Sequence, residues 1–196
     1  MITNKEDYLK YLHEDRIANG NPKTTFLRSL FIYSEHLRIM KYLRILRRME
    51  YLTNINKGFI EKISFAITTY RYHKMSYKLG IWIPVNTVGY GLKMYHIGNT
   101  GIGFGTTLGN NCTLQKGVMV GPTTPGKGPI VGDDVYFAPG AKVFGNIKIG
   151  NNVIVAPNSV VIKDIPDNCV VSGVPAKIIK LNGKKVTEPV LQDPLL

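Results

Sequence analysis

Two residue types that often stabilise small folds are scarce in this chain. Its 196 residues include 2 cysteines and 4 histidines. Cys112 and Cys169 lack the CxxC spacing typical of metal and redox sites, so we expect reduced thiols packed in the interior. No metal site is therefore expected.

Long apolar runs are missing as well. The longest, residues 26–33, is interrupted by Arg28 and is far shorter than the ~20 residues that cross a bilayer. The first residues are polar and include Glu6 and Asp7, unlike a signal or transit peptide. We expect no membrane span and a cytoplasmic location.

Acidic residues are outnumbered. The chain has 13 Asp and Glu against 25 Lys and Arg, a formal net charge of +12. Residues 1–80 hold 15 of the basic residues and 7 of the acidic ones. This excess favours anionic partners such as phosphates, nucleic acid or a lipid surface. Because no basic and aromatic interleaving or known nucleic-acid motif accompanies it, we predict no nucleic-acid partner.

The first part of the chain has helical spacing. Apolar residues follow this spacing in residues 5–17, 25–51 and 59–79. Residues 19–22 and 53–58 supply the Gly, Pro and Asn of turns between them. The N-terminal part is therefore predicted to be α-helical.

A six-residue period replaces the helical spacing after Gly80. Large apolar residues recur at every sixth position, with two frame breaks, over thirteen positions. The next residue is commonly Gly or Ala, and a compact residue such as Cys112 or Val118 stands four places after. The thirteen apolar residues are Trp82, Val88, Met94, Ile102, Leu108, Leu114, Val120, Val131, Phe137, Val143, Ile149, Val155 and Val161.

Such a period predicts a mainly β fold, in which three hexads form one triangular coil of a parallel β-helix. We assign an α-helical N-terminal segment to residues 1–80, a β-helix domain to residues 81–180 and a C-terminal tail to residues 181–196. Asn tolerates φ > 0 better than most residues. We expect that conformation at Asn110, Asn111, Asn151 and Asn152.

Over about residues 82–180 the repeat resembles that of the hexapeptide-repeat acyltransferases. The resemblance implies a left-handed β-helix, an exception to the right-handed rule for parallel crossovers. The period by itself does not set the hand. A β-helix that serves only as a spacer or scaffold is the alternative.

Two interruptions of the period are the places to expect a site, because a uniform prism has no pocket. One separates Met94 from Ile102 by eight residues, and the other separates Val120 from Val131 by eleven. His96, the only histidine beyond residue 73, lies in the first. Imidazole can take a hydroxyl proton near neutral pH, as acetyl transfer from a thioester requires. His96 is our candidate general base, and a structural histidine bonded to a turn is the alternative.

The segment VGYGLKMYHIGNTGIG, with FAPGAKVFG and SGVPAK downstream, resembles the serine acetyltransferases and their relatives in cell-surface polysaccharide biosynthesis. The resemblance implies that His96 is the general base. In true serine acetyltransferases one aspartate supports the histidine, another precedes it and a second histidine lies in the loop. The matching residues here are Ile81, Tyr95 and Gly128, so a backbone carbonyl, water or helical-cap residue would have to orient His96.

A saccharide hydroxyl is the acceptor that we predict, as in the polysaccharide relatives. Tyr95, Gln115 and Lys116 are candidates to line its pocket, since an aromatic face and polar tips suit a carbohydrate. They could equally be ordinary exposed coil residues. Serine is the alternative acceptor, and a catalytically inactive trimeric interaction protein is the second alternative.

Acetyl-CoA is the acetyl donor that the resemblance implies, in a groove between neighbouring prisms of a homotrimer. Its pantetheine arm would lie along small-residue turns and its phosphates near cations. Each of those cations could equally be a solvated surface charge. The candidate residues are Gly121, Ala138, Pro139, Ala156 and Pro157 at turns, and Lys163 and Lys177 as cations.

A basic helix is expected around residues 37–51. Ile39, Leu43, Leu46 and Met49 recur at helical spacing on one arc, which can be buried. The cations would then form a solvated face, or contact anionic lipid at the inner face of the membrane. These cations are Arg38, Lys41, Arg44, Arg47 and Arg48, and the membrane contact is predicted for all but Arg47.

Overall fold

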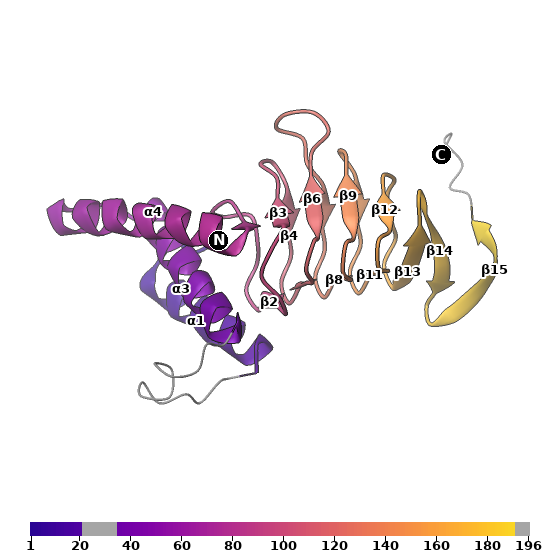
Figure 1. The fold of residues 1–196 in the computed structure, drawn as a ribbon, viewed down its shortest axis with the longest axis horizontal. Coiled ribbons are helices and arrows are strands. Elements are labelled where there is room, and N and C mark those ends of the chain that lie inside the picture. Colours follow the sequence, from indigo (N-terminus) through magenta and orange to yellow (C-terminus); the bar gives the residue numbers. More distant parts are fainter. Residues whose placement is uncertain (21–34, 191–196) are drawn as a thin grey trace.

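The computed structural model describes residues 1–20 and 35–190. Within them, helices come first and short strands follow, as Figure 1 shows. The helix predicted over residues 25–51 lies partly outside the described residues, and its described part starts at Glu35. The helices are α1 (Lys5–Ala18), α3 (Glu35–Asn54) and α4 (Phe59–Leu79).

The ends of α1 and α4 follow from local sequence. The Asn4 side chain accepts the Asp7 N–H at 2.9 Å and so caps the first turn of α1. Gly80 ends α4 in the left-handed conformation, with φ at 62°, and its N–H bonds the carbonyls of Ser76 and Tyr77. The predicted helix over residues 59–79 is confirmed.

Strands follow the helices, and all but the last two pair in parallel along the coils. They are β1 (Ile81–Trp82), β2 (Lys93–Met94), β3 (Thr100–Ile102), β4 (Thr107–Leu108), β5 (Thr113–Leu114), β6 (Met119–Gly121), β7 (Ile130–Val131), β8 (Tyr136–Phe137), β9 (Lys142–Phe144), β10 (Lys148–Ile149), β11 (Ile154–Val155), β12 (Val160–Val161), β13 (Cys169–Gly173), β14 (Ala176–Leu181) and β15 (Lys184–Val190).

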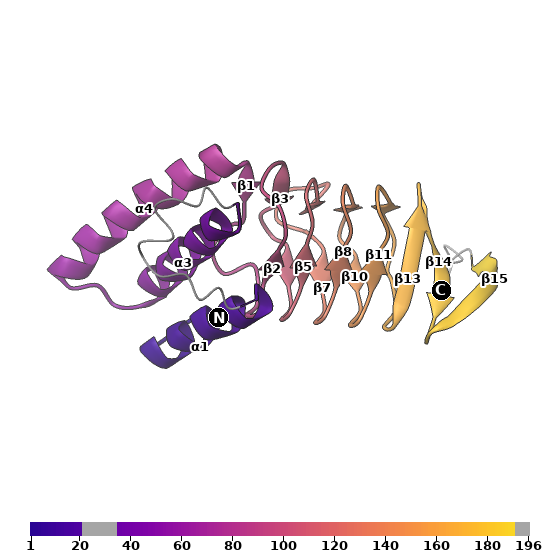
Figure 2. The same cartoon turned by 60° about the horizontal axis from the view of Figure 1, so that its bottom comes forward.

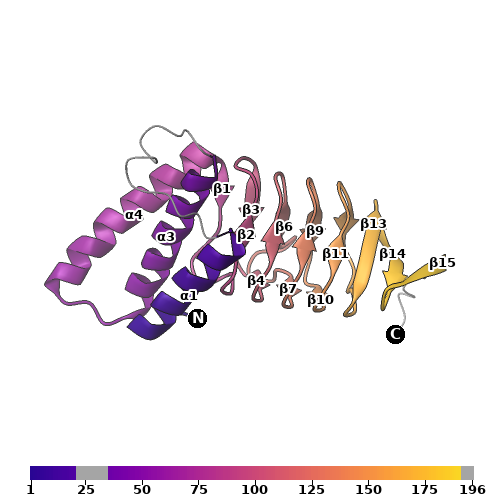
Figure 3. The same cartoon turned by 90° about the horizontal axis from the view of Figure 1, so that it is seen from below.

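From β1 to β13, consecutive strands belong to different sheets, so the chain returns to the same sheet one coil later. The sheets of the described residues are β1-β3-β6-β9-β12, β4-β7-β10 and β2-β5-β8-β11-β13-β14-β15. Figures 1 and 2 show the coils stacked in a row, with the helices at one end. At the other end β14 pairs antiparallel with β13, and β15 pairs antiparallel with β14 (Figure 3). The predicted parallel β-helix with a helical N-terminal segment is confirmed.

The inward positions of the repeat are buried as predicted, with one exception. From Val88 to Val161 the remaining twelve large apolar residues are at most 5% exposed. Trp82 is half-buried instead, while its neighbours Ile81 and Ile83 are buried. Its ring lies against the helical segment, 6.2 Å from the ring of Tyr72. The prediction for Trp82 was wrong because the docking of α4 on the first coil changes which side chains face inward there.

The small residue that follows each inward-facing residue allows neighbouring coils to stack closely. A Cβ at Gly89 would lie 2.6 Å from the carbonyl oxygen of Gly109 in the next coil.

The prediction of positive φ at four Asn residues was half correct. The angle is positive at Asn111 and Asn152 but not at Asn110 or Asn151. The latter two donate their backbone N–H groups to Asp133 and Asp167 of the next coil, both at 2.7 Å.

Arg47 joins the helices to the first coil. Its side chain is fully buried, with Nε 2.7 Å from Asp15 Oδ2 and Nη1 3.0 Å from Glu50 Oε2. It also donates to the carbonyls of Val88 and Gly89, at 2.9 and 2.6 Å. Burial lowers the pKa of this guanidinium, but Glu50 and Asp15 raise it above its ordinary value. Arg47 is therefore not one of the solvent-facing cations with which the sequence grouped it.

The apolar arc predicted for α3 agrees with the structure, and the predicted cationic face agrees in part. Its apolar arc of Ile39, Leu43, Leu46 and Met49 is buried. Lys41, Arg44 and Arg48 are exposed, whereas Arg38 is half-buried. In the described part of the chain, none of the helices has the length and apolarity of a membrane span. Cys112 and Cys169 are free and buried, as predicted.

Candidate functional site

His96 lies in the turn that joins β2 to β3, and its side chain is 56% exposed. Helix α1 fixes the strand that leads to it. The Asn19 side chain donates to the Leu92 carbonyl at 2.8 Å and accepts the Met94 N–H at 3.1 Å. Asp15 accepts the Leu92 N–H at 2.9 Å. The backbone that leads to His96 is therefore held by hydrogen bonds to the helical segment.

A carboxylate from α3 lies against the imidazole. Glu35 Oε2 is 3.3 Å from His96 Nδ1, and Glu35 Oε1 accepts the Ile97 N–H at 2.5 Å. The Ile97 N–H, and after it His96 and Lys116, lower the pKa of Glu35 below its ordinary value. Sequence reasoning did not select Glu35, because 61 residues separate it from His96 and no motif marks it.

The serine acetyltransferases that the sequence resembles have aspartates at the positions of Ile81 and Tyr95 and a histidine at the position of Gly128. The residues present here cannot supply a carboxylate or an imidazole. Ile81 is 1% exposed in the core, and Tyr95 is 44% exposed with the Lys93 ammonium 4.7 Å from its ring centroid. At Gly128 a Cβ would lie 2.8 Å from the backbone nitrogen of Thr106, so the backbone leaves no room for a side chain.

The candidate acceptor-binding residues lie at the same edge of the prism as His96. Leu114 pairs with Met94, so Gln115 and Lys116 occupy the positions of Tyr95 and His96 one coil on. Gln115 is 9% exposed and donates to the Tyr136 hydroxyl at 3.0 Å. The Lys116 side chain passes Gly98, where a Cβ would be 3.5 Å from Lys116 Cε. Tyr95 thus adjoins His96 in the same turn, and Gln115 and Lys116 lie in the turn one coil on.

Some of the candidate donor-binding residues share this edge, which we call the His96 edge. It consists of the turns that follow β2, β5, β8 and β11, namely residues 95–99, 115–118, 138–141 and 156–159. Ala138 and Pro139 lie in its third turn and Ala156 and Pro157 in its fourth. The Pro139 carbonyl accepts the Asn158 N–H at 3.0 Å, which stacks these turns.

The remaining candidates lie elsewhere. Gly121 ends β6 and begins the loop that rises above the neighbouring turns in Figure 1. Lys163 follows β12 in the same row of turns, and Lys177 lies in β14. A single chain therefore does not bring all of the candidate donor-binding residues together.

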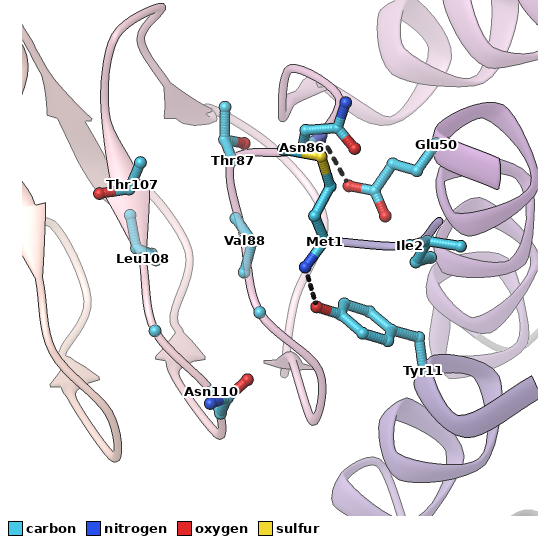
Figure 4. A pocket seen from close by; sticks show the side chains of 12 residues that line it. Met1, Ile2, Tyr11, Glu50, Asn86, Thr87, Val88, Thr107, Leu108 and Asn110 are labelled. Carbon is cyan, nitrogen blue, oxygen red and sulfur yellow. Dashed lines mark hydrogen bonds between the residues drawn. The ribbon is translucent and has the colours of Figure 1, made fainter. Parts of the chain in front are cut away.

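A pocket of about 310 Å³ lies between the helices and the first coils, away from His96 (Figure 4). The Met1 ammonium donates to the Tyr11 hydroxyl at 3.0 Å and the Asn86 N–H to Glu50 at 3.0 Å. The second of these bonds joins α3 to the first coil. Among the described residues, no three His, Cys, Asp or Glu side chains gather where they could hold a metal ion.

Comparison with known proteins identifies the repeat. Residues 128–163 match the family described as bacterial transferase hexapeptide (six repeats). This part of the β-helix therefore carries hexapeptide repeats similar to those of that family. A serine acetyltransferase from Staphylococcus aureus (strain Mu50 / ATCC 700699) is 41% identical over 106 residues, or 53% of this chain and 50% of that protein. The chain thus spans about half the length of the curated relatives that it matches.

Solved structures share the fold of the β-helix and its helical segment. A Neisseria gonorrhoeae serine acetyltransferase in complex with serine is 26% identical, with a TM-score of 0.65 over 90% of this chain and 70% of that one. A serine acetyltransferase in complex with CoA is 23% identical, with a TM-score of 0.69 over 89% of this chain and 71% of that one. The fold is therefore the left-handed parallel β-helix that the resemblance implied.

Proposed function

We propose that this chain transfers an acetyl group from acetyl-CoA to an acceptor hydroxyl, with His96 as the general base. The observation that supports it best is the His96 imidazole, which projects from the β-helix beside a carboxylate. The acceptor oxygen attacks the thioester carbonyl carbon as its proton passes to His96. The tetrahedral intermediate then expels the CoA sulfur, which takes that proton, and the products are an acetyl ester and CoA.

Serine is the acceptor that the comparisons favour over the saccharide predicted from the sequence. The relatives reported above carry the name serine acetyltransferase, and one was solved with serine. The saccharide prediction rested on Ile81, Tyr95 and Gly128, and these relatives lend it no support. Serine is therefore the first acceptor to test, and saccharides are the second.

A homotrimer is part of the proposal because of where the candidate residues lie. Ala138, Pro139, Ala156 and Pro157 share the His96 edge, whereas Gly121 and Lys163 lie along another row of turns. In a threefold assembly, one subunit's loop after β6 could face the His96 edge of the next. Such a groove would enclose acetyl-CoA and shield the exposed imidazole from water.

The test is acetyl-CoA turnover with serine, nucleotide sugars and lipid-linked glycans as separate acceptors, read by thiol release and product mass. We expect an acetylated product with serine. A saccharide product alone would reverse the choice of acceptor. No product with any acceptor would favour an inactive trimeric interaction protein.

Peripheral contact with an anionic membrane is a second proposal, supported by α4. Phe59 and Ile60 are 80% and 76% exposed. They line a groove of about 300 Å³ together with Arg48 and Arg71. Apolar side chains beside exposed cations suit a surface of anionic lipid, and Lys41 and Arg44 extend the cationic face.

Flotation with anionic vesicles at low salt tests this contact. We expect binding that weakens with salt and is lost in the double variant Phe59→Ser/Ile60→Ser. The matched control is Leu9→Ser, since Leu9 is 54% exposed on α1. No flotation of the unchanged protein would remove the membrane contact and leave the acetyl-transfer proposal intact.

A further inference from the structure

We propose that Glu35 is the positioning residue of His96, a role that the sequence resemblance assigned to no residue of this chain. The Glu35 carboxylate accepts a hydrogen bond from His96 Nδ1–H and leaves Nε2 unprotonated toward the acceptor. The catalytic part of this inference rests on the proposed acetyl transfer. The pairing itself does not.

The geometry ties both carboxylate oxygens to the turn that carries the imidazole. Oε1 accepts the Ile97 N–H at 2.5 Å and Oε2 lies 3.3 Å from His96 Nδ1. Because the amide of the next residue holds one oxygen, the other is directed at the ring. A carboxylate that bridges a side chain and the adjacent amide restricts the ring's orientation more than a single contact would.

The charge of Glu35 decides the direction of this hydrogen bond. The Ile97 N–H lowers the pKa of Glu35 most, and His96 and Lys116 lower it further, so the carboxylate is ionised at neutral pH. An ionised carboxylate has no proton to donate, so the proton of the shared bond belongs to Nδ1. Nε2 is then the basic nitrogen, and the carboxylate stabilises the imidazolium that forms when it accepts a proton.

The helical segment places this carboxylate. Glu35 begins α3, and Arg47 on the same helix is bound to the carbonyls of Val88 and Gly89 in the first coil. The helix is thereby fixed against the coil that leads to His96. The β-helix has the buried Ile81 where the resemblance implied a supporting aspartate, so the carboxylate comes from the helices instead.

A surface ion pair without function is the competing explanation, since the side chains of His96 and Glu35 are 56% and 40% exposed. Exposed pairs add little to stability. Loss of such a pair would leave kcat unchanged. A positioning role requires both the tautomer of His96 and kcat to change while the fold stays intact.

The experiment compares Glu35→Gln and Glu35→Asp with the control Glu6→Gln, which alters an exposed glutamate in the first turn of α1. If the carboxylate orients the base, Glu35→Gln lowers kcat by roughly 10²-fold with little change in KM, and Glu35→Asp restores part of the rate.

A second measurement does not depend on turnover. The ¹⁵N shifts of the His96 ring report its tautomer, and we expect Nδ1–H in the unchanged protein and a shift toward Nε2–H in Glu35→Gln. If the unchanged protein transfers no acetyl group but the tautomer responds to Glu35, the proposed function fails and the pairing stands. An unchanged tautomer, or unchanged kcat in an active enzyme, overturns the role of Glu35.

Discussion

Arg47 and Asp15 form an ion pair of 2.7 Å, and the side chains are 0% and 2% exposed where the helices meet the first coil. We expect Arg47→Ala to lower the free energy of unfolding by about 3–5 kcal/mol, because Asp15 and Glu50 would keep buried charges without their partner. Urea unfolding followed by circular dichroism measures this. Arg44→Ala, at an exposed position of the same helix, should change it by less than about 0.5 kcal/mol.

His96→Ala should abolish most acetyl transfer without unfolding the protein. Removal of a general base typically costs ~10²–10⁴-fold in rate, and the exposed imidazole contributes little to the core. Thiol release gives the rate, and thermal melting and sedimentation give the fold and assembly. Full activity in this variant would exclude His96 as the base, and His13→Ala on the exposed face of α1 is the control.

Phe137 and Phe104 offer a matched test of the inward positions. Phe137 is 0% exposed and Phe104 is 67% exposed. Truncation of a buried Phe to Ala costs about 3–5 kcal/mol, so Phe137→Ala should unfold at much lower urea concentration. Phe104→Ala should differ from the unchanged protein by about 1 kcal/mol or less. Equal losses in the two variants would contradict the assignment of inward and outward positions.

Gly128→Ala should destabilise the chain because its Cβ would meet the backbone of Gly105 and Thr106, as well as the Thr106 hydroxyl, and the backbone cannot move aside. We expect a loss of about 1–3 kcal/mol, and Gly128→His should lose at least as much. Gly58→Ala is the comparison, since a Cβ there meets only the carboxylate end of Glu61. A stable and fully folded Gly128→His would show that the loop can hold a histidine.

Cys112 should resist alkylation in the folded protein. Burial raises the pKa of its thiol to about 12, and the thiolate is the reactive form. At pH 8, iodoacetamide should leave Cys112 unmodified in the folded protein and modify it in urea, as peptide mass spectrometry would show. Rapid modification without urea would mean that the coil around Cys112 opens.

Much of the site could be found from sequence because a break in a regular period is visible along the chain. The interruption after Met94 marked His96, and the turns after Phe137 and Val155 were recognisable as small-residue positions. Glu35 could not be found in this way, because its contact with His96 depends on how α3 docks against the first coil.

The sequence by itself determined the β-helix, its inward residues from Val88 to Val161 and the helix over residues 59–79, since each depends on spacing between near neighbours. Only the tertiary structure decided that Trp82 packs against the helices, that Arg47 is buried in the joint and that Glu35 lies beside His96. These contacts join residues far apart in the chain, and their partners depend on the angle and position at which the helices meet the coils.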